Sequence, residues 1–147
     1  MIQLKRPHEI EGIRTSGKVL AECLLRLDEI IKEGVSTWDI DKFCYSFIKE
    51  HRGIPSCLGY CGYPNSACVS VNEVVIHGIP SKKKILNNGD IVSVDLCVTL
   101  DGYVSDSTRT YEVGNVSPEV HKLNVVTKKC LDLGIEAASK KGARILD

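Results

Sequence analysis

One stretch constrains the fold more than any other. Two runs of alternating apolar and polar residues, IVSVDLCVTL (91–100) and YVSDSTRTYE (103–112), are joined by Asp101-Gly102. Such alternation is typical of half-buried β-strands, because successive side chains point to opposite faces of a sheet. Asp-Gly is a preferred pair for the centre of a tight hairpin turn. The sequence therefore predicts a long antiparallel hairpin.

The turn also determines which side chains share a face of the hairpin. With Leu100 opposite Tyr103, Asp106 lies opposite Cys97, and Asp95 lies opposite Thr108. Alternation then places both aspartates on one face as diagonal neighbours, roughly 7–8 Å apart between backbones. The other face of the first strand is apolar, and we expect it to supply the core: Val92, Val94, Leu96, Val98 and Leu100.

Two carboxylates on a partly covered sheet face repel each other and lose hydration. A shared proton, a basic side chain or a metal ion can compensate for this. Arg109 points to the opposite face by parity and is poorly placed to help. A divalent cation suits hard oxygen ligands, but a simply solvated polar face fits the pattern equally well. The hairpin alone therefore leaves a metal site and a solvated face as alternatives.

The remaining segments predict helices and short strands. Apolar spacings of three and four indicate helices, and Ser or Thr before such a run is a typical helix cap. The predicted elements are helices over 9–33, from Ser36 or Thr37 to near Gly53, and after Ser117-Pro118, with short strands over 67–71 and 74–77. The inner face expected for the third helix is Val120, Leu123, Thr127, Cys130, Gly134 and Ala137. This order predicts an α+β fold, with helices on one side of an antiparallel sheet, in a single domain over residues 1–147.

Composition limits the partners and the compartment. Nineteen basic residues balance nineteen acidic ones, which argues against nucleic acid or an anionic membrane as the main partner. No apolar run approaches the roughly 18 residues of a membrane span. Seven cysteines, an odd number, and a charged N-terminus predict free thiols in a reduced, cytoplasmic compartment.

His77 follows the apolar run VVI and precedes GIP, which predicts a position at the end of a strand beside a turn. A lone histidine in such a place is more often packed and hydrogen-bonded than catalytic, so its own surroundings do not assign it a role.

Three longer motifs carry a family resemblance. RPHEIEGIRTSGKVLAECL (6–24), CLGYCGYPNSACVSVNEVVIHGIP (57–80) and GDIVSVDLCVTLDGYVSDSTRTYEVG (89–114) together resemble the type I methionine aminopeptidases, in the right order and over essentially the whole chain. The resemblance implies the "pita-bread" fold, in which two pseudo-symmetric α/β halves surround a dinuclear metal site. This chain would form the N-terminal half of that fold.

The resemblance also implies roles for individual residues. Asp95 and Asp106 match the two metal-binding aspartates of a site for two divalent ions (Co, Mn, Fe or Zn). His77 matches a catalytic histidine near the substrate. The pocket for the methionine side chain is matched by Cys57, Tyr60, Tyr63 and Cys68, together with His77. The implied substrate is the N-terminal methionine of nascent proteins, and the implied place of action is near the ribosome.

The chain departs from the family pattern in three respects. Ser105 stands where Gly is more usual, and Cys97 stands where Thr is common. The remaining ligands, a histidine and two glutamates, match nothing here, and neither His121 nor Glu136 replaces them. We therefore expect a weakly active or inactive half of a metalloaminopeptidase. The alternatives are a non-catalytic binding module or remnant on half a scaffold, and a half that associates with a second copy.

Overall fold

The structure is a computed structural model that describes residues 3–146. The chain up to Asn115 forms one compact unit, and the chain from Val116 onward forms a second. Each is described by itself. The expectation of a single domain stays a prediction, because separate compact units also occur within one domain.

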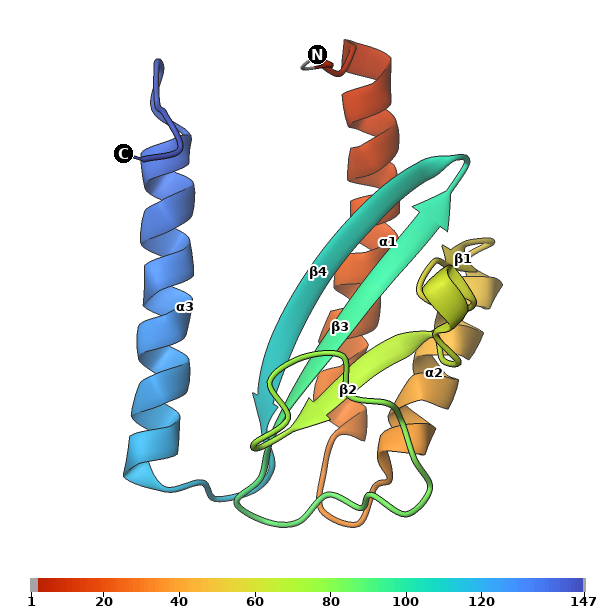
Figure 1. The fold of residues 1–147 in the computed structure, drawn as a ribbon, viewed down its shortest axis with the longest axis vertical. Helices are drawn as coiled ribbons and strands as arrows, with labels where there is room; N and C mark the ends of the chain where they lie inside the picture. The colour runs from red at the N-terminus through yellow and green to blue at the C-terminus, as the bar shows by residue number, and fades with distance from the viewer. Residues whose placement is uncertain (1–2, 147) are drawn as a thin grey trace. The chain divides into compact units, whose positions relative to one another are not determined.

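The first unit is built on a four-stranded antiparallel sheet with β3 (Ile91–Leu100) at its centre (Figure 1). β4 (Tyr103–Glu112) pairs with β3 along its whole length. β2 (Ala67–Val71) and the two-residue β1 (Ile54–Pro55) pair with successive parts of the other edge of β3. The central strand thus connects every other strand of the sheet.

The predicted hairpin and its register are confirmed. Asp101 and Gly102 have φ values of 50° and 83°, as the two central residues of a type I′ turn require. Cys97 pairs with Asp106, and Asp95 pairs with Thr108. Because the register is the predicted one, both aspartates lie on the same face of the sheet.

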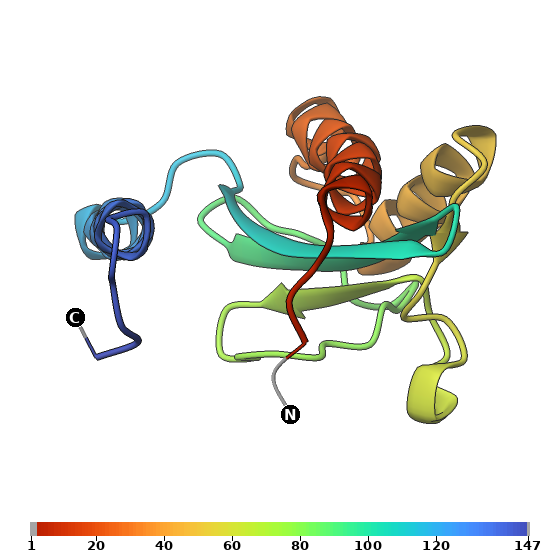
Figure 2. The same cartoon turned by 90° about the horizontal axis from the view of Figure 1, so that it is seen from above.

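Two helices, α1 (Pro7–Ile30) and α2 (Thr37–Glu50), cover the opposite face of the sheet (Figure 2). Ser36 caps α2, as predicted, by accepting a hydrogen bond from the Asp39 amide at 3.1 Å. The core between helices and sheet contains the predicted strand residues Val92, Val94, Leu96 and Val98, which pack with Leu20, Leu24, Leu27, Ile40 and Ile48. The α+β fold with helices on one side of the sheet is therefore confirmed.

The strand predicted over residues 74–77 is wrong. Asn72 has a φ of 53° and reverses the chain after β2, and the Val74 amide donates to the Val71 carbonyl in a turn. Val74, Val75 and Ile76 are 40%, 84% and 66% exposed. A run of β-branched residues forms a strand only where a neighbouring strand supplies hydrogen bonds. Among the described residues, no strand pairs with these three.

The second unit contains α3 (Pro118–Ala138), which starts where the sequence predicts it to start. The Ser117 side chain accepts from the Val120 amide at 3.3 Å, and Pro118 occupies the first turn. None of the described residues of α3 is buried. An amphipathic helix buries a face only against another element, and α3 is the one helix among the described residues of this unit. The predicted inner face therefore stays a prediction. No helix in the described part of the chain is both long and apolar enough to cross a membrane.

Candidate active site

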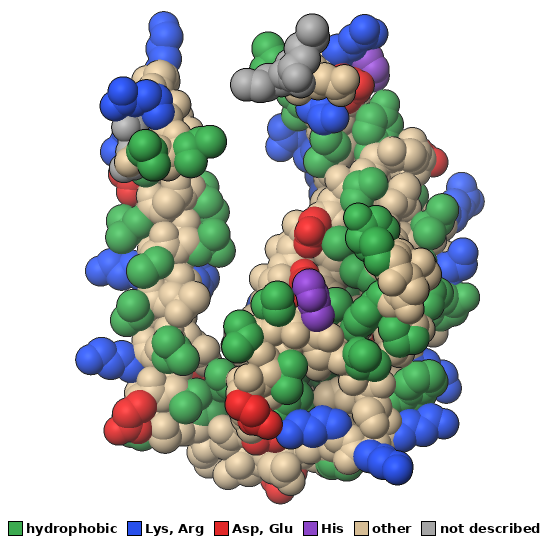
Figure 3. All heavy atoms as spheres, viewed as in Figure 1, with side chains coloured by type: hydrophobic (Ala, Val, Ile, Leu, Met, Phe, Trp, Pro, Cys, Tyr) green, Lys and Arg blue, Asp and Glu red, His purple; other side chains and the backbone are tan. Residues whose placement is uncertain are grey.

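A cavity of about 630 Å³ lies on the sheet face away from α1 and α2. All seven residues that the sequence assigned to a site line it: Cys57, Tyr60, Tyr63, Cys68, His77, Asp95 and Asp106. Figure 3 shows a histidine beside acidic side chains on this face, with hydrophobic side chains around them. The structure thus brings together residues up to 49 positions apart in the chain (57 and 106). Their individual roles stay predictions.

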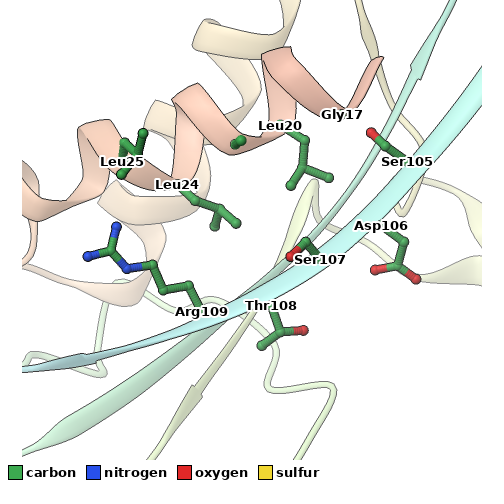
Figure 4. Close-up of a pocket in the computed structure, with 10 residues that line it drawn as sticks. Gly17, Leu20, Leu24, Leu25, Ser105, Asp106, Ser107, Thr108 and Arg109 are labelled. Carbon is green, nitrogen blue, oxygen red and sulfur yellow. The ribbon is translucent and has the colours of Figure 1, made fainter. Parts of the chain in front are cut away.

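The hairpin forms the floor of the cavity. Figure 4 shows Arg109 on the side of β4 that faces α1, and Asp106 and Thr108 on the opposite side. Arg109 forms an ion pair with Asp28 of α1 at 2.8 Å, so its charge is used away from the cavity, as parity predicted. Thr108 Oγ1 donates to Asp95 Oδ1 at 2.7 Å and orients that carboxylate. A smaller hollow of about 410 Å³ lies between α1 and β4 (Figure 4).

One wall of the cavity comes from β2 and the segment before it. Cys68 pairs with Asp95 in the sheet and therefore lies on the same face. Asp41 of α2, only 6% exposed, accepts hydrogen bonds from the Ser66 and Ala67 amides at 2.8 and 2.9 Å and from Asn65 Nδ2 at 2.9 Å. Sequence reasoning missed Asp41. The available signal was an acid beside Ile40, on the apolar face of a predicted helix.

The loop between β1 and β2 closes the other side of the cavity. It contains a short 3₁₀ helix, η1 (Tyr60–Gly62). Tyr60 lies at the rim and is 73% exposed. The Tyr63 hydroxyl lies 3.1 Å from the Ala67 carbonyl oxygen and 3.0 Å from that of Gly78. Tyr63 therefore ties this loop both to β2 and to the segment that carries His77.

Three side chains in or beside the cavity wall have raised pKa values. Burial raises the pKa of the Tyr63 hydroxyl far above its ordinary value, and burial also raises the pKa of the Cys68 thiol. The pKa of the Cys97 thiol is raised by burial and, after that, by the neighbouring Cys57. These groups stay protonated at neutral pH. Protonated sulfur and aromatic carbon form a polarisable, largely apolar surface, which suits a thioether side chain.

His77 has a φ of 57°, the left-handed conformation that residues other than glycine rarely adopt. It lies in an irregular segment that follows the turn after β2, and not at the end of a strand. The next residue holds it in place: the Val69 amide donates to the Gly78 carbonyl at 2.8 Å, and the Gly78 amide donates to Ser70 Oγ at 3.1 Å. Strained backbone that the surroundings hold in place is typical of functional sites, and this conformation accompanies a side chain that lines the cavity.

Replacing Gly78 by Ala is expected to separate the segment that carries His77 from β2. A Cβ atom at this position would lie 2.3 Å from the Val69 carbonyl oxygen and 2.9 Å from the Ser70 Cα, both of which are backbone atoms. We expect the free energy of unfolding to fall by about 1–3 kcal/mol, measured by urea denaturation. Gly17→Ala in α1 is the matched control. A Cβ atom there would lie 4.0 Å from the Ser105 Cβ, an ordinary contact, so this change should be neutral or stabilising. An undiminished stability of Gly78→Ala would contradict the close approach.

The donors present fit part of a metal site. Asp95 and Asp106 provide hard oxygen ligands on one face of one cavity, and cations such as Mn²⁺ and Mg²⁺ bind through carboxylates and retain waters. Over residues 3–146, however, no group of three or more His, Cys, Asp or Glu side chains is arranged to hold a metal ion. The two aspartates are thus candidate ligands, and two are fewer than a dinuclear site needs.

The chain belongs to metallopeptidase family M24, whose family model matches residues 11–147. It is similar to the methionine aminopeptidase of Clostridium acetobutylicum, with 47% identity over 138 residues, 94% of this chain and 55% of that protein. The methionine aminopeptidase of Treponema pallidum is 44% identical over 145 residues, 99% of this chain and 56% of that protein. The chain therefore spans about half the length of the relatives it matches.

Solved structures agree with these relatives. The methionine aminopeptidase of Rickettsia prowazekii superimposes with a TM-score of 0.89 at 40% identity, covering 92% of this chain and 54% of that one. The prolidase of Pyrococcus furiosus, at 22% identity and a TM-score of 0.67 over 81% of this chain and 34% of that one, shares the fold. The predicted fold, the N-terminal half of the pita-bread arrangement, is confirmed.

Proposed function

We propose that this chain supplies half of the active site of a metal-dependent methionine aminopeptidase, which removes the initiator methionine from nascent proteins. The observation that carries this proposal is the single cavity around which both aspartates, His77 and the sulfur and aromatic side chains gather. Because Asp95 and Asp106 are the candidate metal ligands and the described residues hold no group of three or more such side chains, we propose that this half alone is weakly active or inactive.

Each part of the cavity has a proposed role. Asp95 and Asp106 hold divalent ions, with Co, Mn, Fe and Zn as the candidate metals. When bound, such ions supply an activated water and polarise a peptide carbonyl. His77 contacts the substrate beside the bond to be cleaved. Cys57, Tyr60, Tyr63 and Cys68 surround the methionine side chain, whose flexible thioether matches their neutral surface.

The proposed partners follow from the proposed substrate. The protein encounters new polypeptides with an N-terminal methionine near the ribosome, where the initiator methionine first becomes accessible. All seven cysteines are free, which supports our proposal of a reduced, cytoplasmic compartment. The balanced charge supports the expectation that neither nucleic acid nor a membrane surface is the main partner.

A second candidate is a non-catalytic binding module or remnant on half of the scaffold. The observation that favours it is the incomplete ligand set in the described part of the chain. Such a module would keep the cavity and bind methionine-like groups without cleaving a peptide bond. Self-association with a second copy is a further way to complete the ligand set.

A chimera distinguishes the enzyme from the module. Residues 1–147 are fused to the part of the Clostridium acetobutylicum relative that this chain does not cover. Hydrolysis of Met-Ala-Ser is then measured with added Co²⁺ or Mn²⁺. We expect metal-dependent release of methionine by the chimera, and little or none by residues 1–147 alone.

A substitution of His77 in the same chimera tests the proposed catalytic role of this residue. Because a positioned catalytic group contributes roughly 10²–10⁴-fold, we expect His77→Ala to lower kcat/KM of the chimera by at least about 100-fold. His8→Ala, outside the cavity at the start of α1, is the matched control and should change little. A folded, metal-loaded chimera that releases no methionine would favour the binding module.

A further inference from the structure

Two thiols meet in the wall of the cavity. Four of the seven free cysteines line it: Cys57, Cys61, Cys68 and Cys97. Among these, Cys57 and Cys97 are neighbours, since Cys57 follows β1 by two residues and Cys97 lies on β3, the partner strand of β1. Both side chains are only partly buried. Cys97 has no part in the proposed function, and it stands where Thr is common in the family pattern.

The backbone explains why these two thiols meet. β1 pairs with β3 through Ile54↔Thr99 and Pro55↔Val98. The Ser56 amide then donates to the Cys97 carbonyl at 2.9 Å and extends the ladder by one residue. The Leu58 amide donates to the Pro55 carbonyl at 3.2 Å, which closes a turn around Cys57. That turn places Cys57 directly after Ser56, the residue opposite Cys97. The Cys57 side chain lines the cavity.

This arrangement is compatible with a disulfide. A disulfide spans about 4.4–6.8 Å between Cα atoms. Ser56 takes the place opposite Cys97 in the ladder, where Cα atoms are about 4.5–5.5 Å apart, and Cys57 follows Ser56 directly in the chain. Cys57 lies in a turn at the end of a two-residue strand, so a small rotation of the turn can close the remaining gap. Cys23 and Cys44 are also neighbours, but both are 0% exposed and closed to a reagent.

We propose that Cys57 and Cys97 form a dithiol modification site that exchanges with low-molecular-weight disulfides. The Cys57 sulfur attacks one sulfur of the incoming disulfide, loses its proton and releases one small thiol, which leaves a mixed disulfide at Cys57. The second cysteine attacks that mixed disulfide and releases the second small thiol. The protein loses two protons and two electrons, and the reagent gains both as two molecules of small thiol. The product ties the 55–58 turn to β3 inside the cavity.

Glutathione disulfide is the probe for the first test. The folded, reduced chain is incubated with it, the remaining thiols are alkylated, and the protein is digested for peptide mass mapping. We expect one internal disulfide that joins Cys57 to Cys97, formed roughly tenfold or more above any other pair, because the two thiols are held at high effective concentration. Dithiothreitol should reverse it.

Two conservative variants complete the experiment. In Cys97→Thr, we expect Cys57 to keep a glutathione adduct, because no resolving thiol stands beside it. In Cys61→Ser, on the same wall, the Cys57–Cys97 disulfide should form as in the wild type. Oxidised wild-type protein in which Cys97 is still fully alkylated, or in which Cys57 is joined to Cys61 or Cys68, would overturn the proposal. The mapping requires no bound metal, so its outcome is independent of the proposed function.

Discussion

Asparagine in place of Asp106 is expected to lower the affinity of this chain for Mn²⁺ by at least about tenfold, or ~1.4 kcal/mol. Asp106 and Asp95 are diagonal neighbours on one face of one cavity. An amide keeps the size of the carboxylate but removes its negative charge, which is the main attraction for a hard cation. Isothermal titration with Mn²⁺ measures this change, and Asp95→Asn should have the same effect.

The control for this result is another aspartate of the same unit. Asp28 lies on α1, on the opposite side of the sheet, and forms an ion pair with Arg109. Asp28→Asn removes the same charge from the protein but leaves the cavity unchanged, so we expect Mn²⁺ affinity to stay near that of the wild type. Equal affinities of Asp106→Asn and wild type would contradict the assignment of Asp106 as a ligand.

Replacing Asp41 by Ala is expected to lower the free energy of unfolding by about 2–4 kcal/mol. This buried carboxylate accepts hydrogen bonds from two backbone amides and one side-chain amide at the start of β2. Its removal leaves these donors unsatisfied in a region closed to water, and the loss of each buried partner is costly. Urea denaturation followed by Trp38 fluorescence measures the change.

The matched control for Asp41 is an exposed acid. Glu22 lies on α1, half exposed, and pairs with Arg26 at 3.7 Å. Exposed pairs of this kind contribute little, so Glu22→Ala should change stability by no more than about 0.5 kcal/mol. A loss for Asp41→Ala as small as that for Glu22→Ala would show that Asp41 does not hold the start of β2.

The sequence predicted the hairpin well because the signals for it are local. Asp101-Gly102 specifies the turn, and once the turn is known the period of two decides the face of every side chain. The position of Asp95 beside Thr108, and of Asp106 beside Cys97, followed from these two facts alone. The helix caps at Ser36 and Ser117 were equally local and equally correct.

The errors arose where structure depends on distant partners. Val74, Val75 and Ile76 favour a strand by residue type, but the Gly78 carbonyl accepts from the Val69 amide and these three residues are left exposed in an irregular segment. Asp41 was overlooked because its partners lie at least 24 residues away, at Asn65 to Ala67. Residue type alone indicates neither contact, and this is also why the unusual backbone of His77 could not be predicted.

The candidate site needed both the residues and the fold. The two aspartates were predicted from the hairpin, but the pattern alone left a solvated face as an alternative. Tyr60, Tyr63 and Cys68 were linked to them only through the family resemblance. The structure places all of these side chains around one cavity, since Cys68 pairs with Asp95 and Tyr63 reaches the Gly78 carbonyl.

The most direct test of the metal assignment is to locate bound Mn²⁺ by NMR. In uniformly ¹⁵N-labelled protein, paramagnetic Mn²⁺ broadens the amide signals nearest to it first. We predict that the signals of Cys97, Ser107 and Gly78, around the two aspartates, disappear at the lowest Mn²⁺ concentrations. Their loss should be abolished in Asp106→Asn. Broadening that begins at the exposed acids of α1, such as Glu11 and Glu22, would contradict a metal site in this cavity.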